Sequence, residues 1–278
     1  MNKDKIKIHT VSDSTGETVQ GIAKAVGVNF ENVEEFDWTL IKTSAQLKEI
    51  GEALDEKSLV LYTLVDSSLI IELEKICKNK KCKTMSVLKS VSRMVKSLGA
   101  IEKEAVVGAQ HAMDDDYFAR VDAIDFASAH DDGQNFYNIK ESEIVIIGAS
   151  RTSKSPTSFY LANKGYKTSN IPFVDGIKFP DILFNLPEQI LVVGLVRDAE
   201  SLANIRRSRL NSINFKSIKS ETDYTNFEKI EKEMLDFKRI CNANKWPIIS
   251  VQNKSIEETA TQIIKYFHRH RKKINNQD

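Results

Sequence analysis

Short runs of apolar residues alternate with longer amphipathic stretches along most of this chain. The short runs have the length and composition of buried strands, and the stretches between them repeat apolar residues at helical spacing. We predict strands at residues 6–11, 58–66, 81–88, 143–148, 168–174, 189–196 and 247–251. We predict helices at residues 19–30, 67–79, 89–99, 111–130, 198–210, 226–245 and 255–270, with another after residue 155. This alternation implies mainly parallel sheets with right-handed crossovers, so the expected fold class is α/β.

The chain is long enough for two α/β domains. All five prolines lie after residue 155, and the polar stretch DDGQNFYNIKES has the composition of a turn and linker. We therefore expect an N-terminal α/β domain at residues 1–138 and a C-terminal domain with a P-loop-like site at residues 139–278. The helix at 111–130 then falls in the first domain. Its apolar residues lie on roughly one side: Phe118, Val121, Ile124 and Phe126.

The composition is that of a globular protein, with 41% hydrophobic and 28% charged residues. No apolar run approaches the ~20 residues of a membrane-spanning helix. The first residues, MNKDKIKIHTVSDS, lack the apolar core of a signal peptide, so we expect a cytoplasmic protein with no membrane partner. Cys77, Cys82 and Cys241 are too few and too scattered for a disulfide framework, and no histidine near the first two completes a zinc site.

Charge is unevenly distributed, although the net charge is only +1. Residues 1–140 hold 18 lysines and arginines against 23 aspartates and glutamates, and residues 141–278 hold 22 against 16. A basic C-terminal half suits an anionic ligand, although its cluster HRHRKK is typical of a solvated tail. No basic strip is interleaved with aromatic residues, so nucleic acid is not an expected partner.

The stretch EIVIIGASRTSKSPTSFYLANKG has most features of a nucleotide phosphate loop. In the standard loop, a glycine, four residues, a second glycine, a lysine and a hydroxyl residue connect a strand to a helix. Such a loop points backbone N–H groups at phosphate oxygens, at the positive end of the helix. The candidate nucleotide-binding residues are Gly148, Ala149, Ser150, Arg151, Thr152, Ser153, Lys154 and Ser155.

Two residues of this loop have expected roles of their own. Lys154 would reach the terminal phosphates, and the hydroxyl group of Ser155 would bind a magnesium ion. Ser153 stands where the second glycine belongs, so it would adopt left-handed backbone angles at a cost of ~1 kcal/mol. Pro156 suits a first helical turn. The competing interpretation is a serine- and threonine-rich turn that caps an ordinary helix.

Further charged residues follow the strands of the second half. Arg206, Arg207 and Arg209 lie on one predicted helix and could close over phosphates or form a solvated basic face. Asp175 and Asp198 follow predicted strands, at the carboxyl ends where sites form in open α/β sheets. Either aspartate could orient a substrate hydroxyl as a base, bind magnesium or cap the next helix, and capping is favoured for Asp198.

Three polar segments are open to a functional or a structural interpretation. HDDG could place His130, Asp131 and Asp132 near an active site, or it could end a helix with the histidine against the helix dipole. SDSTGET could bind phosphate or a phosphorylated segment, or it could cap its helix through Ser14 or Thr15. MDDD could form a metal-binding cluster, although three adjacent acids at a helix start usually just offset the dipole.

Four stretches occur in one order: VSDSTGET, HAMDDDYFARVDAIDFASAHDDG, GASRTSKSPTS and GLVRDAESLANIRRSRL. Together, with their spacing, they resemble the pyruvate, phosphate dikinase regulatory proteins and the closely related phosphoenolpyruvate synthase regulatory proteins. The resemblance extends from about residue 6 to about residue 267. The second and third stretches are its specific part, and the loops of that family commonly carry serine at the position of Ser153.

The resemblance implies a bifunctional serine/threonine kinase and phosphorylase. Such a protein uses ADP to phosphorylate a threonine beside the catalytic histidine of pyruvate, phosphate dikinase, which inactivates it. It reverses this by phosphorolysis, in which inorganic phosphate attacks and pyrophosphate leaves. Magnesium is an expected cofactor and a homodimer an expected assembly. The candidate catalytic residues are Lys154, Asp175, Asp198, His130 and Asp131, and Ser155 is the candidate metal ligand.

Other functions remain open at this point. The same chemistry could act on phosphoenolpyruvate synthase, and the loop alone would equally fit a small-molecule ATP kinase or a nucleotide sensor that transfers nothing. A whole second α/β domain with its own hydroxyl-rich loop argues against the small-molecule kinase. Lys154 and several nearby acids argue against a mere sensor.

Overall fold

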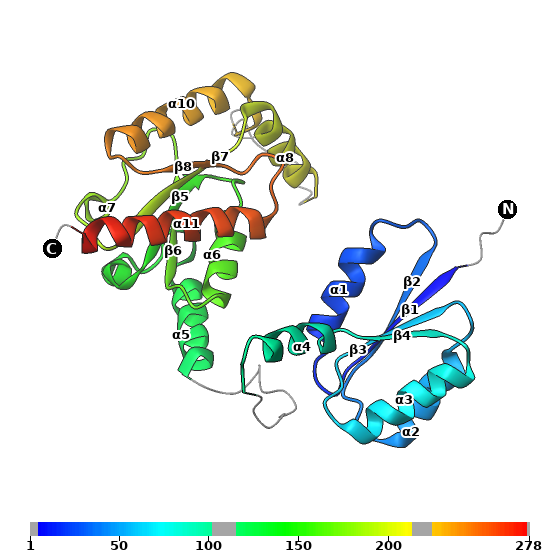
Figure 1. Cartoon of the computed structure of the whole chain (residues 1–278). Coiled ribbons are helices and arrows are strands. Elements are labelled where there is room, and N and C mark those ends of the chain that lie inside the picture. Colours follow the sequence, from blue (N-terminus) through cyan, green and yellow to red (C-terminus); the bar gives the residue numbers. More distant parts are fainter. Residues whose placement is uncertain (1–4, 102–114, 213–223, 277–278) are drawn as a thin grey trace. The chain divides into compact units, whose positions relative to one another are not determined.

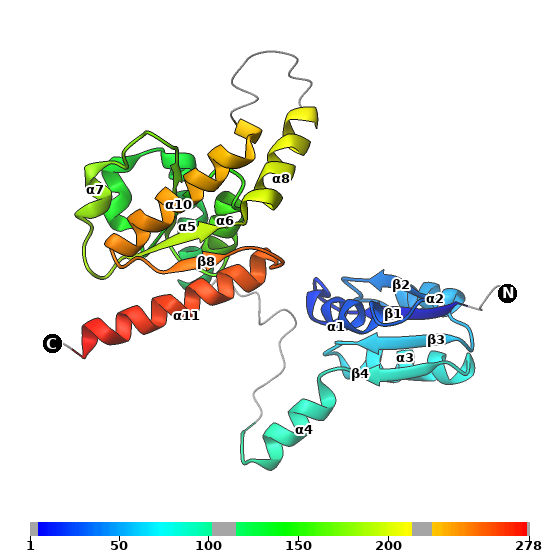
Figure 2. The same ribbon diagram turned by 90° about the horizontal axis from the view of Figure 1, so that it is seen from above.

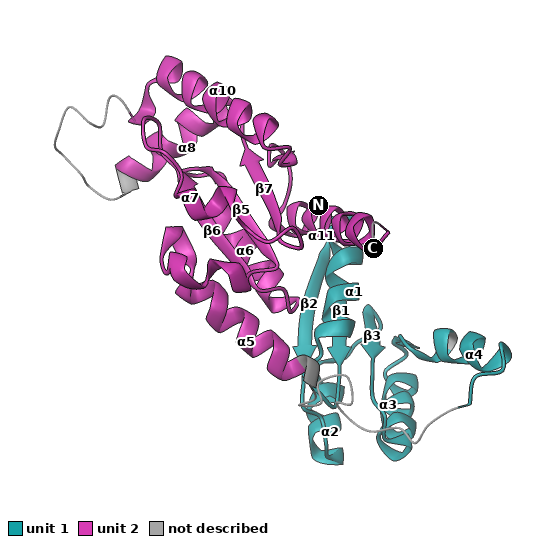
Figure 3. Ribbon diagram, turned by 90° about the vertical axis from the view of Figure 1, so that its left-hand side faces the viewer, with its two compact units in different colours: residues 1–112 teal, residues 113–278 magenta. Residues whose placement is uncertain are grey.

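A computed structural model of the chain describes residues 5–101, 115–212 and 224–276 (Figure 1). The chain divides into two compact units, Met1–Ala112 and Met113–Asp278, coloured separately in Figure 3. Each unit holds a four-stranded parallel sheet, so the predicted α/β fold class is confirmed. Among the helices of the described ranges, none is long and apolar enough to cross a membrane.

The first unit has helices on both faces of its sheet. Helix α1 packs on one face through Val19 and Ala23, and α2 and α3 pack on the other through Leu47 and Leu73. Its strands, in the order β2-β1-β3-β4, are β1 (Ile6–Val11), β2 (Val33–Trp38), β3 (Ser58–Tyr62) and β4 (Lys83–Ser86). Its helices are α1 (Glu17–Gly27), α2 (Ser44–Ala53), α3 (Ser67–Asn79) and α4 (Lys89–Ser97).

The second unit repeats this layered arrangement. Helices α10 and α11 lie on opposite faces of its sheet (Figure 2). Its strands, in the order β6-β5-β7-β8, are β5 (Ile144–Ala149), β6 (Thr168–Phe173), β7 (Leu191–Val196) and β8 (Ile248–Ser250). Its helices are α5 (Asp115–Ala129), α6 (Lys154–Asn163), α7 (Asp181–Phe184), α8 (Ala199–Ser212), α10 (Phe227–Ala243) and α11 (Ile256–Asn275), with short 3-10 helices η2 (Asp131–Gly133) and η3 (Phe136–Glu141).

The order of the strands explains where each hydroxyl-rich loop lies. In each unit the first strand has the second strand on one side and the third on the other. The order in which strands are added to the sheet therefore changes direction at β1 and at β5. In open α/β sheets, ligand crevices form at the carboxyl ends of the strands where this change occurs. SDSTGET follows β1 and the loop at residues 148–155 follows β5, so both occupy this position.

Two elements of the first unit are missing from the sequence-based prediction, namely β2 and α2. Strand β2 has the sequence VEEFDW and lies at the edge of its sheet with no buried residue, so its acidic composition hid it. Helix α2 is short and polar, but its start at Thr43 carries a capping box with Gln46. In the second unit, Ser255 likewise forms a capping box with Glu258 at the start of α11.

Helix α5 belongs to the second unit, where it packs against α6 and β6. The sequence-based division at 138/139 had assigned it to the first domain. Of the four apolar residues expected on one side of this helix, Phe126 is buried, whereas Phe118, Val121 and Ile124 are exposed. The buried contact with α6 is made by Ala123 and Ala127, which pack on Ala162. Small side chains let the two helices approach closely, and a search for large apolar residues overlooks such a face.

Substitution of Ala123 by leucine tests this contact. Because overpacking a close contact typically costs about 1–3 kcal/mol, Ala123→Leu should lower the free energy of unfolding of the second unit by that amount. Phe118→Ala, on the exposed side of the same helix, should change it by less than about 0.5 kcal/mol. The tryptophans Trp38 and Trp246 lie one in each unit, so urea unfolding followed by fluorescence in a Trp38→Phe background reports on the second unit. Equal effects of both substitutions would contradict the packing.

Candidate functional site

The loop between β5 and α6 has an unusual backbone. Arg151 and Ser153 have positive φ angles of 74° and 62°, which place both in the left-handed region. The left-handed conformation expected where serine replaces glycine is therefore present at Ser153. Helix α6 begins at the next residue, and the N–H groups of a first helical turn lack partners within their helix. The turn thus gathers backbone donors at the positive end of α6.

Gly148 is the one glycine of this loop, and its lack of a side chain is essential. A Cβ atom here would lie 2.7 Å from the carbonyl oxygen of Leu195 on β7 and 2.8 Å from Oγ1 of Thr152. Thr152 is fully buried, and its hydroxyl group donates to the carbonyl oxygen of Ala149 at 2.9 Å. The loop is therefore folded tightly back over the end of its strand.

Lys154 lies inside the protein, with only 5% of its surface exposed. Its ammonium group donates to the same carbonyl oxygen of Ala149 at 3.2 Å. Burial lowers the pKa of Lys154, while the carboxylates of Asp132 and Asp131 raise it and the charge of Arg206 lowers it. The lysine thus combines partial desolvation with two nearby carboxylates, an arrangement that often marks a functional group.

A cavity of about 390 Å³ opens beside this loop, within the size range of small-molecule sites. Its lining combines cationic groups, hydroxyl groups and one carboxylate. The lining residues are Asp132, Ser150, Arg151, Ser153, Lys154, Ser155, Pro156, Arg197 and Ile205. Five of the eight candidate nucleotide-binding residues therefore face one cavity, and its surplus of positive charge favours an anion.

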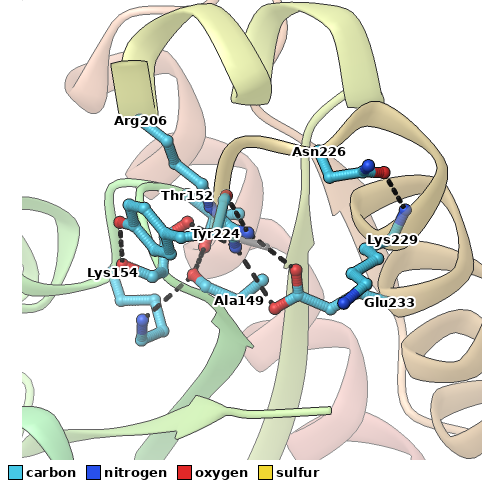
Figure 4. Close-up of polar contacts among 9 residues, drawn as sticks. Ala149, Thr152, Lys154, Arg206, Tyr224, Asn226, Lys229 and Glu233 are labelled. Carbon is cyan, nitrogen blue, oxygen red and sulfur yellow. Dashed lines mark hydrogen bonds and ion pairs between the residues drawn. The ribbon is translucent and has the colours of Figure 1, made fainter. Parts of the chain in front are cut away.

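Arg206 of α8 contacts both the loop and Glu233 of α10, as Figure 4 shows. It is 3% exposed and forms an ion pair with Glu233 of α10, at 2.9 Å between Nη1 and Oε2. Its guanidinium also donates to the carbonyl oxygens of Ser150 and Tyr224, both at 3.3 Å, and lies over the tyrosine ring. The tyrosine hydroxyl is 3.0 Å from Oγ of Ser150. Arg206 therefore links two helices to the loop.

These contacts correct the predicted arginine cluster. Arg206 is neither part of a solvated basic face nor among the residues that line the cavity. Arg207 and Arg209 are exposed, so they do not share the environment of Arg206. Arg197, in the turn between β7 and α8, lines the cavity instead.

The HDDG segment ends α5 next to the cavity. His130 is buried, its ring stacks on Phe126, and its Nδ1 is 2.8 Å from the carbonyl oxygen of that residue. Its Nε2 has no partner among the described residues. Asp132 lines the cavity, whereas Asp131 is half-buried beside β6. The HDDG segment therefore lies near Lys154, as expected if it belongs to an active site. It also follows the end of α5, as expected if it terminates the helix.

Asp175 and Asp198 lie just beyond the carboxyl ends of β6 and β7, as predicted, but neither lines the cavity. Asp175 is 3.9 Å from the ammonium group of Lys232 in an exposed ion pair. Asp198 accepts a hydrogen bond of 2.8 Å from the backbone N–H of Ser201, so its predicted capping of α8 is present. Their catalytic roles stay predictions.

The loop after β1 is organised differently from the prediction. Gly16 occupies the N-cap position of α1, with a φ of 81°, so the N-cap residue is neither Ser14 nor Thr15. Asp13 is buried and accepts a hydrogen bond of 2.7 Å from the backbone N–H of Val65, which joins this loop to the one after β3. Of the MDDD segment, the first two residues lie outside the described ranges and the last two begin α5.

Sequence reasoning missed Glu233, Tyr224 and Arg197 as parts of this site. The position of Glu233 did carry a signal, since it lies between Ile230, Met234 and Phe237 on the buried face of α10. A carboxylate on such a face is rarely buried without a partner, and that partner is Arg206. Tyr224 and Arg197 had no comparable signal, because their contacts join segments far apart in the chain.

The residues present fit a magnesium ion held mainly by a nucleotide. In the described ranges, no three histidine, cysteine, aspartate or glutamate side chains are grouped as metal ligands. Magnesium commonly uses one or two protein oxygens and takes its other ligands from substrate phosphates and water. The hydroxyl group of Ser155 lines the cavity and can serve as such a ligand.

The fold and the cavity thus define a two-unit α/β protein with a cationic strand–loop–helix site. Comparison with known proteins adds its family. The family described as kinase/pyrophosphorylase matches residues 8–264. A protein named pyruvate, phosphate dikinase regulatory protein from Anaplasma phagocytophilum is 40% identical over 97% of this chain and 96% of the relative. A protein of the same name from Wolbachia pipientis wMel is 40% identical over 97% of this chain and 98% of the relative. A third, from Paramagnetospirillum magneticum, is 39% identical over 96% and 85%.

The chain therefore belongs to the kinase/pyrophosphorylase family, as its four sequence stretches indicated. Membership assigns it a phosphotransferase role of the kinase type.

Substitution of Ser153 tests the left-handed turn. A β-branched residue tolerates this conformation poorly, so Ser153→Val should lower the free energy of unfolding of the second unit by about 1–2 kcal/mol. Ser153→Gly should stay within about 1 kcal/mol of the wild type, because glycine adopts the turn freely but is more flexible when unfolded. Urea unfolding followed by Trp246 fluorescence provides the measurement. A tolerated valine would show that the turn does not persist in solution.

Removal of Glu233 tests the buried ion pair. Glu233→Ala leaves the guanidinium of Arg206 buried without its counter-charge, so we expect a loss of about 3 kcal/mol in the free energy of unfolding. Asp236→Ala removes the half-buried partner of the exposed Arg239, one turn further along α10, and should cost less than about 0.5 kcal/mol. The same fluorescence measurement compares them. If both variants lose equal stability, the pair does not support the loop.

Proposed function

We propose that this protein is a bifunctional serine/threonine kinase and phosphorylase that acts on pyruvate, phosphate dikinase. In the forward direction it transfers the β-phosphoryl group of ADP to a threonine of the dikinase and inactivates it. In the reverse direction, inorganic phosphate removes that phosphoryl group as pyrophosphate. The names of the relatives favour the dikinase over phosphoenolpyruvate synthase as the protein substrate.

The observation that carries this proposal is the buried Lys154 at the start of α6, beside a cationic cavity. Phosphoryl transfer requires positioning and charge stabilisation more than covalent chemistry. The backbone donors of the 148–155 loop would hold the two phosphates of ADP. The ammonium group of Lys154 would stabilise the charge that develops on the transferred group, and its partial burial strengthens that interaction.

Both directions of the reaction present the cavity with similar groups. ADP carries two linked phosphates, and phosphorolysis brings one inorganic phosphate to one phosphothreonine and forms two linked phosphates again. Arg151 and Arg197 supply further positive charge at the cavity wall. Magnesium, held by Ser155 and the phosphates, would neutralise part of the phosphate charge.

Removal of the lysine provides the main test. Purified protein is mixed with dikinase and ADP labelled at its β-phosphorus, with γ-labelled ATP in a parallel reaction. Wild-type protein should label the dikinase from ADP. Lys154→Ala should reduce the rate by ~100-fold or more, since loss of one preorganised charge-stabilising donor has an effect of this size. Lys164→Ala removes an exposed lysine from the C-terminal end of the same helix and should keep the wild-type rate.

Other outcomes of this experiment favour other functions. Transfer from ATP alone would indicate an ordinary kinase, and binding of ADP without transfer would indicate a sensor. Wild-type rates in Lys154→Ala would show that the nucleotide binds elsewhere. The reverse reaction is checked by release of labelled pyrophosphate when phosphorylated dikinase and inorganic phosphate are supplied together.

A further inference from the structure

A second cavity, of about 510 Å³, opens in the second unit. Its wall is formed by α7 and the loop that follows it, the start of β7, the turn between α10 and β8, and the last turns of α11. No residue lines both this cavity and the one beside the 148–155 loop. Its volume lies within the range of small-molecule sites, so the second cavity is a candidate site in its own right.

The two cavities lie at opposite ends of the same strands. Leu191 and Val192, the first residues of β7, belong to the wall of the second cavity. Leu191 pairs in parallel with Ile144, the first residue of β5, so the two strands begin at the same edge of the sheet. The 148–155 loop leaves β5 at the other edge. The second cavity can therefore hold a ligand of its own.

Aromatic and proline rings form part of this wall. The rings of Phe184 and Trp246 are stacked, with centroids 5.5 Å apart and planes at 27°. Phe184 is 46% exposed, so solvent reaches this part of the wall. Pro187 and Pro247 also line the cavity, and their rings restrict the backbone on either side of it. A flat and rigid apolar surface of this kind suits a planar ring, which can stack on it.

Cationic residues stand beside this apolar surface. Lys245, Lys273 and His270 line the cavity, and Glu188 is the one acid among its lining residues. The two lysines alone outweigh the carboxylate, whatever the charge of the histidine. This surplus of positive charge favours an anion.

Lys245 holds an uncommon backbone conformation at this wall. Its φ of 58° lies in the left-handed region, just after the end of α10, where glycine is the usual residue. The next N–H, of Trp246, donates to the carbonyl oxygen of Cys241 at 2.9 Å and closes the turn. A lysine adopts these angles less readily than glycine does. The turn thus places a positive charge directly beside the stacked rings, at some cost in stability.

The basic cluster HRHRKK contributes to the same wall. Its composition is typical of a solvated tail, yet His270 and Lys273 of this cluster lie on α11 and line the cavity. Nε2 of His270 is 2.6 Å from the carbonyl oxygen of Glu188. A carbonyl oxygen only accepts, so this nitrogen carries the proton. The bond joins the end of α11 to the loop before β7, which connects two sides of the cavity.

We propose that the second cavity binds an organic anion built on a planar ring system. The ring packs on the surface of Phe184 and Trp246, and the anionic group lies near Lys245 and Lys273. Aromatic carboxylates and purine nucleotides share this chemistry. The site is separate from the one proposed for phosphoryl transfer, so the inference does not depend on the reaction proposed above.

The chain carries its own reporter for this site. Of its two tryptophans, Trp246 lines the cavity, so Trp38→Phe leaves a single fluorophore at the wall. The probe is anilinonaphthalene sulfonate, which joins fused rings to one anionic group and accepts energy from tryptophan. We expect saturable energy transfer from Trp246, with one probe bound per chain.

Paired lysine substitutions test the anion contact. Lys245→Ala with Lys273→Ala should weaken probe binding by ~10-fold or more, because both cations beside the sulfonate are lost. Lys265→Ala with Lys272→Ala changes the net charge equally. Both control lysines are exposed on α11 and lie outside the lining, so this variant should stay within about 2-fold of the wild type.

A phenylalanine substitution tests the ring contact. Phe184→Ala removes half of the stacked pair and should weaken probe binding by ~3- to 10-fold. Phe227→Ala removes a ring that is 48% exposed at the start of α10 and lies outside the lining, so binding should stay within about 2-fold. Circular dichroism checks that both variants are folded.

Competition identifies the ligand class. AMP or indole carboxylate should displace the probe at a concentration at least ~10-fold lower than indole, which lacks the anion, or inorganic phosphate, which lacks the ring. The tighter of the first two compounds distinguishes a nucleotide from an aromatic carboxylate. The same titrations in Lys154→Ala should agree within about 2-fold, since a nucleotide at the 148–155 loop does not displace the probe.

Several outcomes would overturn the proposal. Equal losses in the two lysine pairs, or in the two phenylalanine variants, would show that the probe binds the surface without using this cavity. Inorganic phosphate as effective as AMP would indicate a plain anion site, and indole as effective as its carboxylate would indicate an apolar surface. Probe binding that disappears as the protein concentration rises would show that a second copy of the chain covers the cavity.

Discussion

The carbonyl oxygen of Ala149, at the end of β5, is the point on which the candidate site depends. It accepts a hydrogen bond from the hydroxyl of Thr152 and another from the ammonium group of Lys154. These two contacts turn the chain back over its own strand and hold the lysine at the start of α6. Ala149 is the last residue of β5, and its carbonyl oxygen accepts these bonds from the loop that directly follows the strand.

The supports of this loop come from distant parts of the second unit. Arg206 of α8 and Glu233 of α10 neutralise each other and leave donors for the carbonyl oxygens of Ser150 and Tyr224. On the other side, Asn170 of β6 fixes the turn that carries Asp132. The loop and the turn that form the cavity wall are therefore held in place by buried side chains. The geometry of a candidate site of this kind is set by its supporting residues as much as by the residues that line the cavity.

Much of the fold follows from the sequence, because the buried strands of both units are continuous apolar runs and their helices repeat apolar residues regularly. The elements that escaped prediction are those whose burial is partial, such as the acidic edge strand β2. The face of α5 was misjudged because alanines make the contact there, and alanine gives little signal in a hydrophobic pattern. In the site, the loop residues were predictable from their order in the chain. Tyr224 and Asn170 were not, since hydrogen bonds between distant segments leave no periodic trace. Glu233 was indicated only by its place on the buried face of α10.

The left-handed serine at position 153 has a consequence for how such loops are recognised. The backbone angle, and not the glycine that usually accompanies it, is what the turn demands. A search pattern that requires glycine at this point would miss the chain, although Ser153 adopts the left-handed angle that the glycine would supply. A motif defined by backbone dihedral angles would identify loops of this kind that a motif defined by residue types misses.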